Sequence, residues 1–299
     1  KINVIGNTRT LDNVIRREFR LKEGELFDSV KLKRSKQRIN NLQFFEDVKI
    51  DTRRGKEPDL IDITTTVTER ATGSVNIGAG YSSTEDLMFN AGISQNNFMG
   101  TGRRLVFSTN LSSRRTDFNL SFTDPRIFDT TMSGGIDAFN RKTNYYSYKA
   151  RKTGAGFRLG KSLSEYDWAG LNYNFADTEI TDVVTATSYL KNETRVTSRV
   201  SPSFIRDTRD NFMNPSSGSR HVVRFDLAGL GGVKFHRMSY DTSHYWPIVG
   251  KLVGMLHGNI SWADGYGDDD LPSFEKYYMG GPKSLRGYTL KNIGPKNNS

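Results

Sequence analysis

The chain has 299 residues, enough for two domains with a sizeable core. Its 43 Lys and Arg against 33 Asp and Glu give a net charge of +10, which permits contact with nucleic acid, anionic lipid or acidic proteins and leaves the fold open. It contains no cysteine, which excludes disulfides and thiolate sites. No run of about 18 apolar residues occurs, so the sequence predicts no membrane-spanning helix. Because the chain opens inside a strand-like segment, KINVIG, we expect it to be a portion of a longer protein.

The first 71 residues alternate helix and strand signals in a small unit. Thr10 is a reasonable N-cap for a first helix over 11–19, and a second helix is expected to start after Asp28. Strand patterns precede and follow the two helices, at residues 2–6, 46–52 and 60–69. The order strand, helix, helix, strand, strand predicts an α+β domain with a three-stranded sheet under two helices.

From Gly73 onward almost every segment has a period of two. Val75, Ile77 and Tyr81 fall on one face of the first such segment, with Asn76 and Gly78 on the other. The same alternation recurs in about eleven segments, many of them roughly 9 to 12 residues long and joined by turn-rich connections. The sequence therefore predicts a large antiparallel sheet over residues 72–299.

Two environments explain this alternation: a soluble sandwich that hides its apolar face, or a transmembrane barrel that turns this face to lipid. The strand lengths suit a tilted crossing of the hydrocarbon layer, and the face opposite the apolar one is rich in Asn, Ser, Gly, Arg and Asp. Aromatic residues such as Tyr81, Trp168 and Trp262 gather at predicted strand ends, where an interfacial girdle belongs. These features favour an antiparallel transmembrane β-barrel.

Several phrases of the chain carry a family resemblance. They are VIGNTRT, VIRREFRLKEGE and SKQRINNLQFFEDV before residue 49, ERATGSVNIGAGYSS and QNNFMGTGRRL around the first predicted strands, and GGPKSLRGYTLKNIGPK near the end. Together they resemble the BamA family of outer-membrane protein assembly factors, with the last POTRA domain at residues 1–71 and the N-terminal part of the barrel at residues 72–299. The resemblance implies a barrel of sixteen strands, of which roughly five would follow Ser299.

The most specific phrase is LRGY, formed by Leu285, Arg286, Gly287 and Tyr288. The family has Val where Leu285 stands, a conservative departure. The resemblance implies that these residues lie in the sixth extracellular loop, which folds back into the lumen, where Arg286 would hold an acidic group on the barrel wall. Without the resemblance, Arg286 reads as an ordinary loop arginine in solvent. The spacing of the glycines and lysine here does not match a P-loop.

The resemblance also implies a function and a site. The function is folding and insertion of β-barrel proteins into the outer membrane, by opening of a lateral seam whose edge pairs with a substrate strand. The glycine content of the first strand predicts a weak seam. The seam residues would be Gly73, Ser74, Val75, Asn76, Ile77, Gly78, Ala79 and Gly80. The expected partners are unfolded outer-membrane proteins, accessory assembly lipoproteins and outer-membrane lipid of a Gram-negative cell, with the POTRA domain in the periplasm.

Other functions stay open at this point. A related POTRA-barrel translocation or secretion pore, similar to TamA or to two-partner secretion transporters, and a passive porin would share the strands, and a soluble basic binding protein would share the charge and alternation. The sequence contains no recognisable set of a nucleophile, a base and a group that orients the base. It therefore predicts that the protein is not an enzyme and needs no cofactor. The four histidines lack metal-ligand spacing, and the acidic segment 264–270 reads as a solvated loop. No interleaved aromatics suggest nucleic acid, and Pro215 and Gly218 indicate a turn.

Overall fold

The computed structural model describes most of the chain. The described residues are 1–55, 57, 60–82, 85–145, 148–184, 191–267, 270–281, 285–288 and 293. The elements divide into a three-stranded sheet with two helices and an eleven-stranded sheet. Among the described residues, no helix is long and apolar enough to span a membrane.

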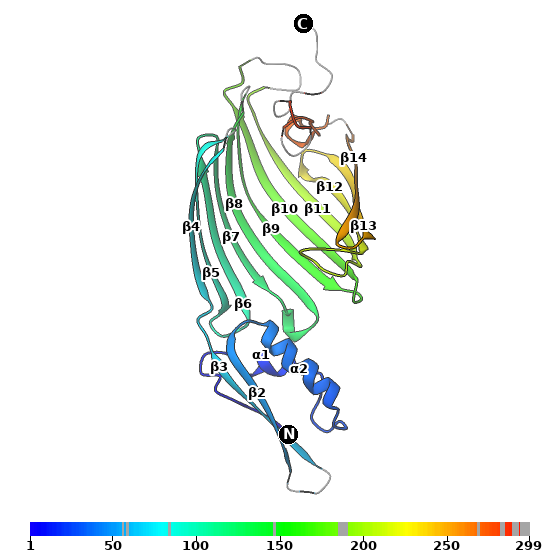
Figure 1. The fold of residues 1–299 in the computed structure, drawn as a ribbon. Coiled ribbons are helices and arrows are strands. Elements are labelled where there is room, and N and C mark those ends of the chain that lie inside the picture. The colour runs from blue at the N-terminus through cyan, green and yellow to red at the C-terminus, as the bar shows by residue number, and fades with distance from the viewer. Residues whose placement is uncertain are drawn as a thin grey trace. The chain divides into compact units, whose positions relative to one another are not determined.

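The first sheet contains β1 (Ile2–Ile5), β2 (Phe45–Arg54) and β3 (Ile61–Glu69) in the order β1-β3-β2. β1 is parallel to the central β3 and β2 is antiparallel to it. Helices α1 (Asp12–Arg16) and α2 (Ser29–Asn41) lie beside this sheet (Figure 1). The core joins both helices to the sheet through Val14, Ile15, Ile39, Val48 and Val67, all nearly without solvent contact. The predicted order of elements is confirmed.

The two helices begin differently. α2 starts as predicted, because the side chain of Asp28 accepts hydrogen bonds from the backbone N–H groups of Val30 and Lys31. The predicted cap of α1 is wrong: its N-cap is Leu11, which makes no side-chain cap, and the helix is shorter than predicted. The hydroxyl of Thr10 is engaged elsewhere, since it accepts a hydrogen bond from Asn97.

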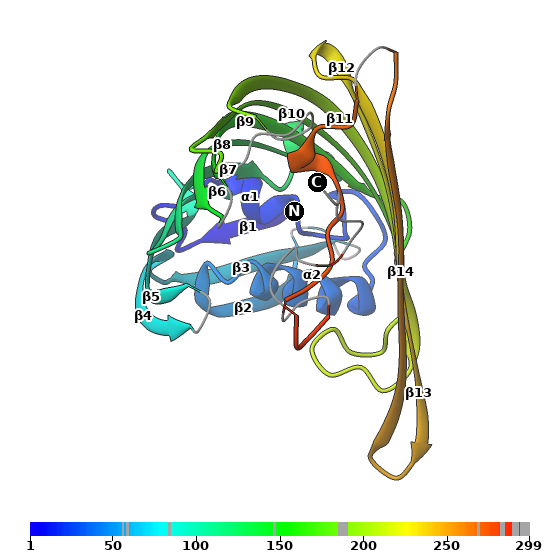
Figure 2. The ribbon, with the colours of Figure 1, turned by 90° about the horizontal axis from the view of Figure 1, so that it is seen from above.

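The predicted eleven strands are confirmed and form one antiparallel sheet in which order along the chain is also order in space. Their bounds are β4 (Gly73–Ser82), β5 (Asp86–Phe98), β6 (Arg103–Ser112), β7 (Arg115–Asp124), β8 (Met132–Asn144), β9 (Lys149–Ser162), β10 (Asp167–Thr181), β11 (Glu193–Asp207), β12 (Gly218–Gly232), β13 (Phe235–Val249) and β14 (Leu252–Gly265). Two short 3-10 helices, η1 (Ile127–Asp129) and η2 (Ser273–Glu275), follow β7 and β14. Figure 2 shows β4 as an end strand.

The eleven strands expose their apolar face, whereas several polar residues of the opposite face are buried. Ile77 is 84% exposed, Leu120 46% and Ile260 73%, although each lies in the middle of its strand. Several polar residues of the other face are buried, among them Ser201 and Asp226. A soluble sandwich would bury the apolar side chains, so this arrangement is the one expected of strands whose apolar face contacts lipid.

The chain divides into two compact units, residues 1–144 with 153–161, and residues 145–152 with 162–299. The first unit therefore holds the small three-stranded sheet together with β4 to β8. The predicted domain boundary at residue 72 stays a prediction. Within the described part of the chain, no group of three metal-ligating side chains comes together, and residues 268 and 269 of the acidic segment lie outside that part.

Candidate functional site

The predicted seam residues form one edge of the large sheet. β4 pairs with β5 in a continuous register from Gly73 opposite Gln95 to Ser82 opposite Asp86, and no other described strand pairs with it. The side chains of Val75, Ile77 and Tyr81 are largely exposed. An end strand has a row of backbone N–H and C=O groups without a partner, which is the feature that another strand can pair with.

Gly78 and Gly80 leave two neighbouring positions on one face of β4 without a side chain. Gly78 lies opposite Asn90, and a Cβ built on Gly78 would come within 2.6 Å of the Asn90 Oδ1 atom. Gly80 lies opposite Met88, whose terminal methyl group covers it at 3.9 Å from such a Cβ. Side chains of β5 therefore fill the space over these two positions, and β4 itself contributes little packing to a strand on its other side.

Shortly before β4, the carboxylate of Glu69 accepts several hydrogen bonds from residues 8 to 10. Glu69, the last residue of β3, accepts hydrogen bonds from the Thr8 hydroxyl at 2.9 Å and from the backbone N–H groups of Arg9 and Thr10 at 3.0 and 2.6 Å. Partial burial opposes ionisation of this group, but the hydrogen bonds outweigh it and hold the pKa of Glu69 below its ordinary value. β3 leads directly into β4 (Figure 1).

The same segment is bonded to the turn between β5 and β6. The backbone N–H of Leu11 donates to the carbonyl of Gly100 at 2.9 Å. Asn97 donates to the Thr10 hydroxyl and accepts from the N–H of Gly102, each at 2.8 Å. Gly100 has φ +74°, and a Cβ there would collide with the carbonyl oxygen of Arg9, so this close approach requires glycine.

Ion pairs add a second contact, to the segment after β7. Arg17 pairs with Asp129 at 3.0 Å, and its side chain is only 8% exposed. Glu18 is equally buried and pairs with Arg38 of α2 at 2.6 Å and with Arg126 at 3.3 Å. Because Arg17 and Glu18 are mostly out of water and each has a partner, these ion pairs resist separation more than fully exposed pairs do.

A cavity of about 510 Å³ lies at this junction, and we call it the junction cavity. It is lined by Arg9, Thr10, Phe44, Glu69, Arg70, Ala71, Thr72, Gly73, Gln95, Asn97, Met99 and Gly100. A second cavity of about 480 Å³ shares Arg9, Glu69, Arg70 and Ala71 with it. The side chains of Arg9 and Arg70 are exposed and make no ion pair or hydrogen bond with any described residue. The lining of the junction cavity thus includes two arginines and the first residue of the sheet edge.

The LRGY residues form a tight turn. Gly281 N–H donates to the Tyr288 carbonyl at 2.9 Å, and Leu285 bridges to Gly281. Gly287 has φ +88°, the left-handed region that favours glycine. Arg286 is exposed, and none of the described residues pairs with it, so its predicted clamp stays a prediction.

A charge cluster upstream of this turn was missed by the sequence reasoning. Glu275 of η2 is 5% exposed and pairs with Lys152 of β9 at 3.4 Å, Arg199 of β11 at 3.5 Å and Arg237 of β13 at 3.1 Å. Asp226 of β12, directly opposite Arg237 in register, accepts from its Nε at 2.7 Å. The one available signal was this alignment of opposite charges across neighbouring strands, which becomes visible only once the register is known.

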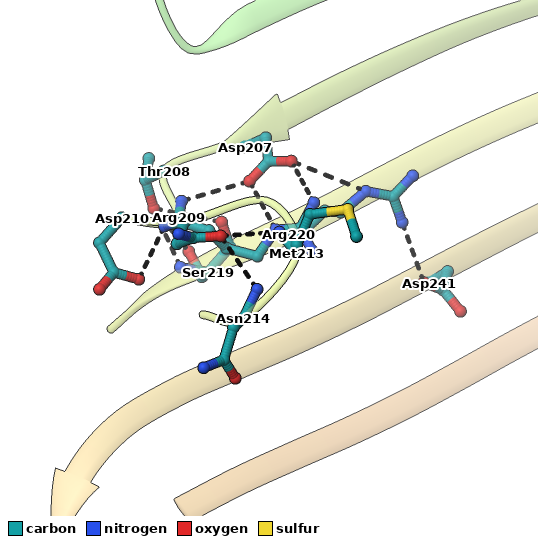
Figure 3. Close-up of polar contacts among 10 residues, drawn as sticks. Asp207, Thr208, Arg209, Asp210, Met213, Asn214, Ser219, Arg220 and Asp241 are labelled. Carbon is teal, nitrogen blue, oxygen red and sulfur yellow. Dashed lines mark hydrogen bonds and ion pairs between the residues drawn. The ribbon is translucent and has the colours of Figure 1, made fainter. Parts of the chain in front are cut away.

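The segment RDTRDNFMNPSSGSR forms an ordered turn between β11 and β12, as predicted (Figure 3). Arg209 binds both oxygens of Asp207, at 2.8 and 2.6 Å. Asp210 accepts from the hydroxyl of Ser216 and from the backbone of residues 216 and 217, and these bonds hold the pKa of Asp210 down at about 2. This is turn chemistry without a nucleophile and base.

Comparisons with known proteins agree with this geometry. Residues 1–70 match the POTRA family model, described as surface antigen variable number repeat, and residues 97–299 match the Omp85 superfamily domain. The outer membrane protein assembly factor BamA of Neisseria meningitidis is 30% identical over 99% of this chain and 40% of its own length. The sorting and assembly machinery component 50 homolog of Mus musculus is 25% identical over 97% of this chain and 65% of its own length.

A solved structure agrees as well. BamA from Haemophilus ducreyi lacking POTRA domains 1-3 superposes with a TM-score of 0.89 at 26% identity, covering 98% of this chain and 60% of that one.

A POTRA domain followed by antiparallel strands with an exposed apolar face defines an outer-membrane β-barrel protein of the POTRA-bearing class. The Omp85 model covers well over half of the residues, and the chain therefore belongs to the Omp85 superfamily. It spans about 40% of the length of the BamA proteins of Neisseria meningitidis, Nitratidesulfovibrio vulgaris and Neorickettsia risticii.

Proposed function

We propose that the protein folds β-barrel proteins and inserts them into the outer membrane by pairing their strands with the edge of β4. The observation that carries the proposal is this edge: a glycine-containing end strand, unpaired on one side among the described residues and joined through a three-residue connection to the POTRA-like sheet. Relatives that match nearly the whole chain are named as outer membrane protein assembly factors, which supports the same function.

The mechanism uses the physical weakness of an unpaired edge. The edge groups of β4 need hydrogen-bond partners, and a substrate strand satisfies them by β-augmentation. Once paired, the substrate strand offers its own far edge to the next strand, so that a new sheet grows from β4. Closure of the new barrel satisfies its backbone within the bilayer, and burial of its apolar face in lipid supplies the free energy without a nucleotide.

The proposed partners follow from the surfaces on each part. Unfolded outer-membrane proteins are the substrates, and the exposed apolar face of the strands contacts outer-membrane lipid. The POTRA domain lies in the periplasm, where its edge strands β1 and β2 are available to nascent chains. Accessory lipoproteins bind the exposed cations of α2, among them Lys33, Arg34 and Lys36.

Single cysteines test the edge. Ser74→Cys, Asn76→Cys and Gly78→Cys should each crosslink to a cysteine in the last strand of a stalled substrate barrel, at substrate positions that step by two along with the β4 position. Because the chain has no cysteine of its own, every crosslink reports the introduced residue.

The matched control is Asn172→Cys on β10, an interior strand that pairs with β11. Its backbone groups are already used, so it should give no crosslink. Crosslinks that concentrate at residue 172 with none on β4 would contradict strand pairing at this edge and favour passage of the substrate away from it.

A further inference from the structure

The direction of β4 determines which end of a paired strand meets the junction cavity. β4 begins at Gly73, which lines the cavity, and runs from there to Ser82. A strand that pairs antiparallel with β4 runs the other way, so its C-terminal end lies beside Gly73. If the paired strand is the last strand of its chain, it ends in a free carboxylate at this place.

We propose that the junction cavity binds the C-terminal carboxylate of the strand that pairs with β4, through Arg9 and Arg70. The inference deepens the proposed function and rests on it, because it names the end of the substrate that this protein recognises. A guanidinium group has a planar set of donors that matches both oxygens of a carboxylate. Two arginines whose side chains have no partner among the described residues line one cavity, beside the start of the sheet edge.

The carboxylate already in the cavity does not take these donors. Glu69 is fully engaged by the Thr8 hydroxyl and by the backbone N–H groups of Arg9 and Thr10. It therefore orders the backbone around the cavity and leaves both guanidinium groups for a ligand. Two arginines and one glutamate give the lining a net positive charge, which attracts an anion and disfavours the neutral end of an amidated chain.

The remaining lining fits the last side chain of such a strand. Phe44, Ala71 and Met99 contribute apolar surface next to the arginines, and Met99 is 79% exposed. A volume of about 510 Å³ lies within the range of pockets that bind small ligands and exceeds that of one side chain. The ligand class is thus a peptide C-terminus with an apolar last residue and a free carboxylate.

The test compares two peptides on the complete gene product in lipid nanodiscs. Both carry the sequence of the last strand of a substrate barrel with a fluorophore at the N-terminus, one ends in the free acid and the other in the amide, and anisotropy gives each Kd. We expect the acid to bind about tenfold more tightly, the effect of one good charge-assisted contact. In the Arg9→Ala, Arg70→Ala double variant the acid and the amide should bind alike.

Controls separate this site from general charge effects. Arg53→Ala removes an exposed arginine of β2 that does not line the cavity, and it should leave the preference for the acid intact. Arg70→Lys keeps the charge but loses the planar pair of donors, and we expect a preference between that of the original chain and that of the double variant.

Equal affinity of the unaltered protein for acid and amide would overturn the proposal. If both peptides still crosslinked to Ser74→Cys, pairing at β4 would stand and only the carboxylate site would fall, whereas absence of any crosslink would defeat the proposed function itself. A preference that is present in phosphatidylcholine discs and collapses in phosphatidylglycerol discs would show that the arginines take lipid phosphate, which also overturns the proposal.

Discussion

Glu275 provides a sharp test of how the segment after β14 is held. This carboxylate is almost fully buried and has three cationic partners, which come from three different strands. The LRGY turn follows about ten residues later on the same segment. We expect Glu275→Gln, which keeps the size and one acceptor oxygen but removes the charge, to release η2 from the sheet.

The size of the effect follows from burial. Removing one partner of a buried ion pair costs about 3 to 5 kcal/mol. The partner cations here are 18 to 24% exposed, and Asp226 still pairs with Arg237 after the change, so we expect a cost at or below the lower end of this range, about 2 to 3 kcal/mol. Since 1.4 kcal/mol is a factor of ten, the population of the detached segment should rise roughly 30- to 150-fold.

Amide hydrogen exchange measures this population directly. When opening and closing are fast, the exchange rate of the amides in residues 273–281 follows the opening equilibrium. These amides should exchange roughly 30- to 150-fold faster in Glu275→Gln, while amides of β10 and β11 keep their rates. Glu165→Gln is the matched control, because Glu165 is an exposed glutamate of the β9–β10 connection with no partner among the described residues.

Exchange at residues 273–281 that stays at its original rate in Glu275→Gln would refute the reasoning. It would mean that the ion pairs only offset their own desolvation and that other contacts hold the segment. A uniform increase in all strands would instead indicate global destabilisation, which a thermal unfolding curve of the same variant distinguishes.

Three further predictions concern the other parts of the chain. Leu120→Arg should destabilise the protein in lipid by about 2 to 4 kcal/mol if residue 120 lies near the midplane of the bilayer. Asn119→Arg, on the polar face, should lower the stability clearly less. If a folding titration in lipid gave the same stability for both variants, the assignment of Leu120 to the lipid-facing side would be wrong. Gly100→Ala should loosen the contact with Arg9 and raise amide exchange at residue 11, while Gly24→Ala, also at positive φ but with open space around it, should leave that amide unchanged. If Arg286 clamps the loop as predicted, Arg286→Lys should make the loop more sensitive to protease and should impair assembly of outer-membrane proteins. Unchanged protease sensitivity in Arg286→Ala, together with normal assembly, would mean that Arg286 is only solvated.

The eleven strands could be predicted because their signal is local. Within each strand, apolar and polar residues alternate with a period of two, as they do around Ile77 and Leu120. This alternation can be seen without knowing which strands pair. The choice of a barrel over a sandwich rested on strand length, on the polar residues of one face and on aromatic residues at strand ends, and the exposure of these same apolar side chains in the structure supports it. The α2 cap at Asp28 was predictable for the same reason, because cap and helix are adjacent in sequence.

The contacts that sequence reasoning missed are long-range. Thr10 looked like a helix cap, but its hydroxyl bonds to Asn97, 87 residues away. Glu275 meets cations 38 to 123 residues away, and nothing in its own neighbourhood marks it as buried. The junction cavity likewise needs β3, β4 and the β5–β6 turn to be in place before Arg9 and Arg70 come together. A single sequence contains no pairing register, and all three features depend on one.

A fixed end point for the substrate strand would also solve a register problem. A strand that slips by one residue along β4 turns every side chain to the opposite face, which places polar groups in lipid. A carboxylate held in the junction cavity would stop the strand at one register. If one residue is added after the natural C-terminus, the substrate strand cannot both place its carboxylate in the junction cavity and keep its apolar side chains on the lipid face. If two residues are added, the strand can shift by two positions, so that the carboxylate reaches the cavity and each side chain keeps its face. We therefore expect affinity for the complete gene product to fall further with one added residue than with two. A loss that grows evenly with each residue would show that the cavity does not set the register.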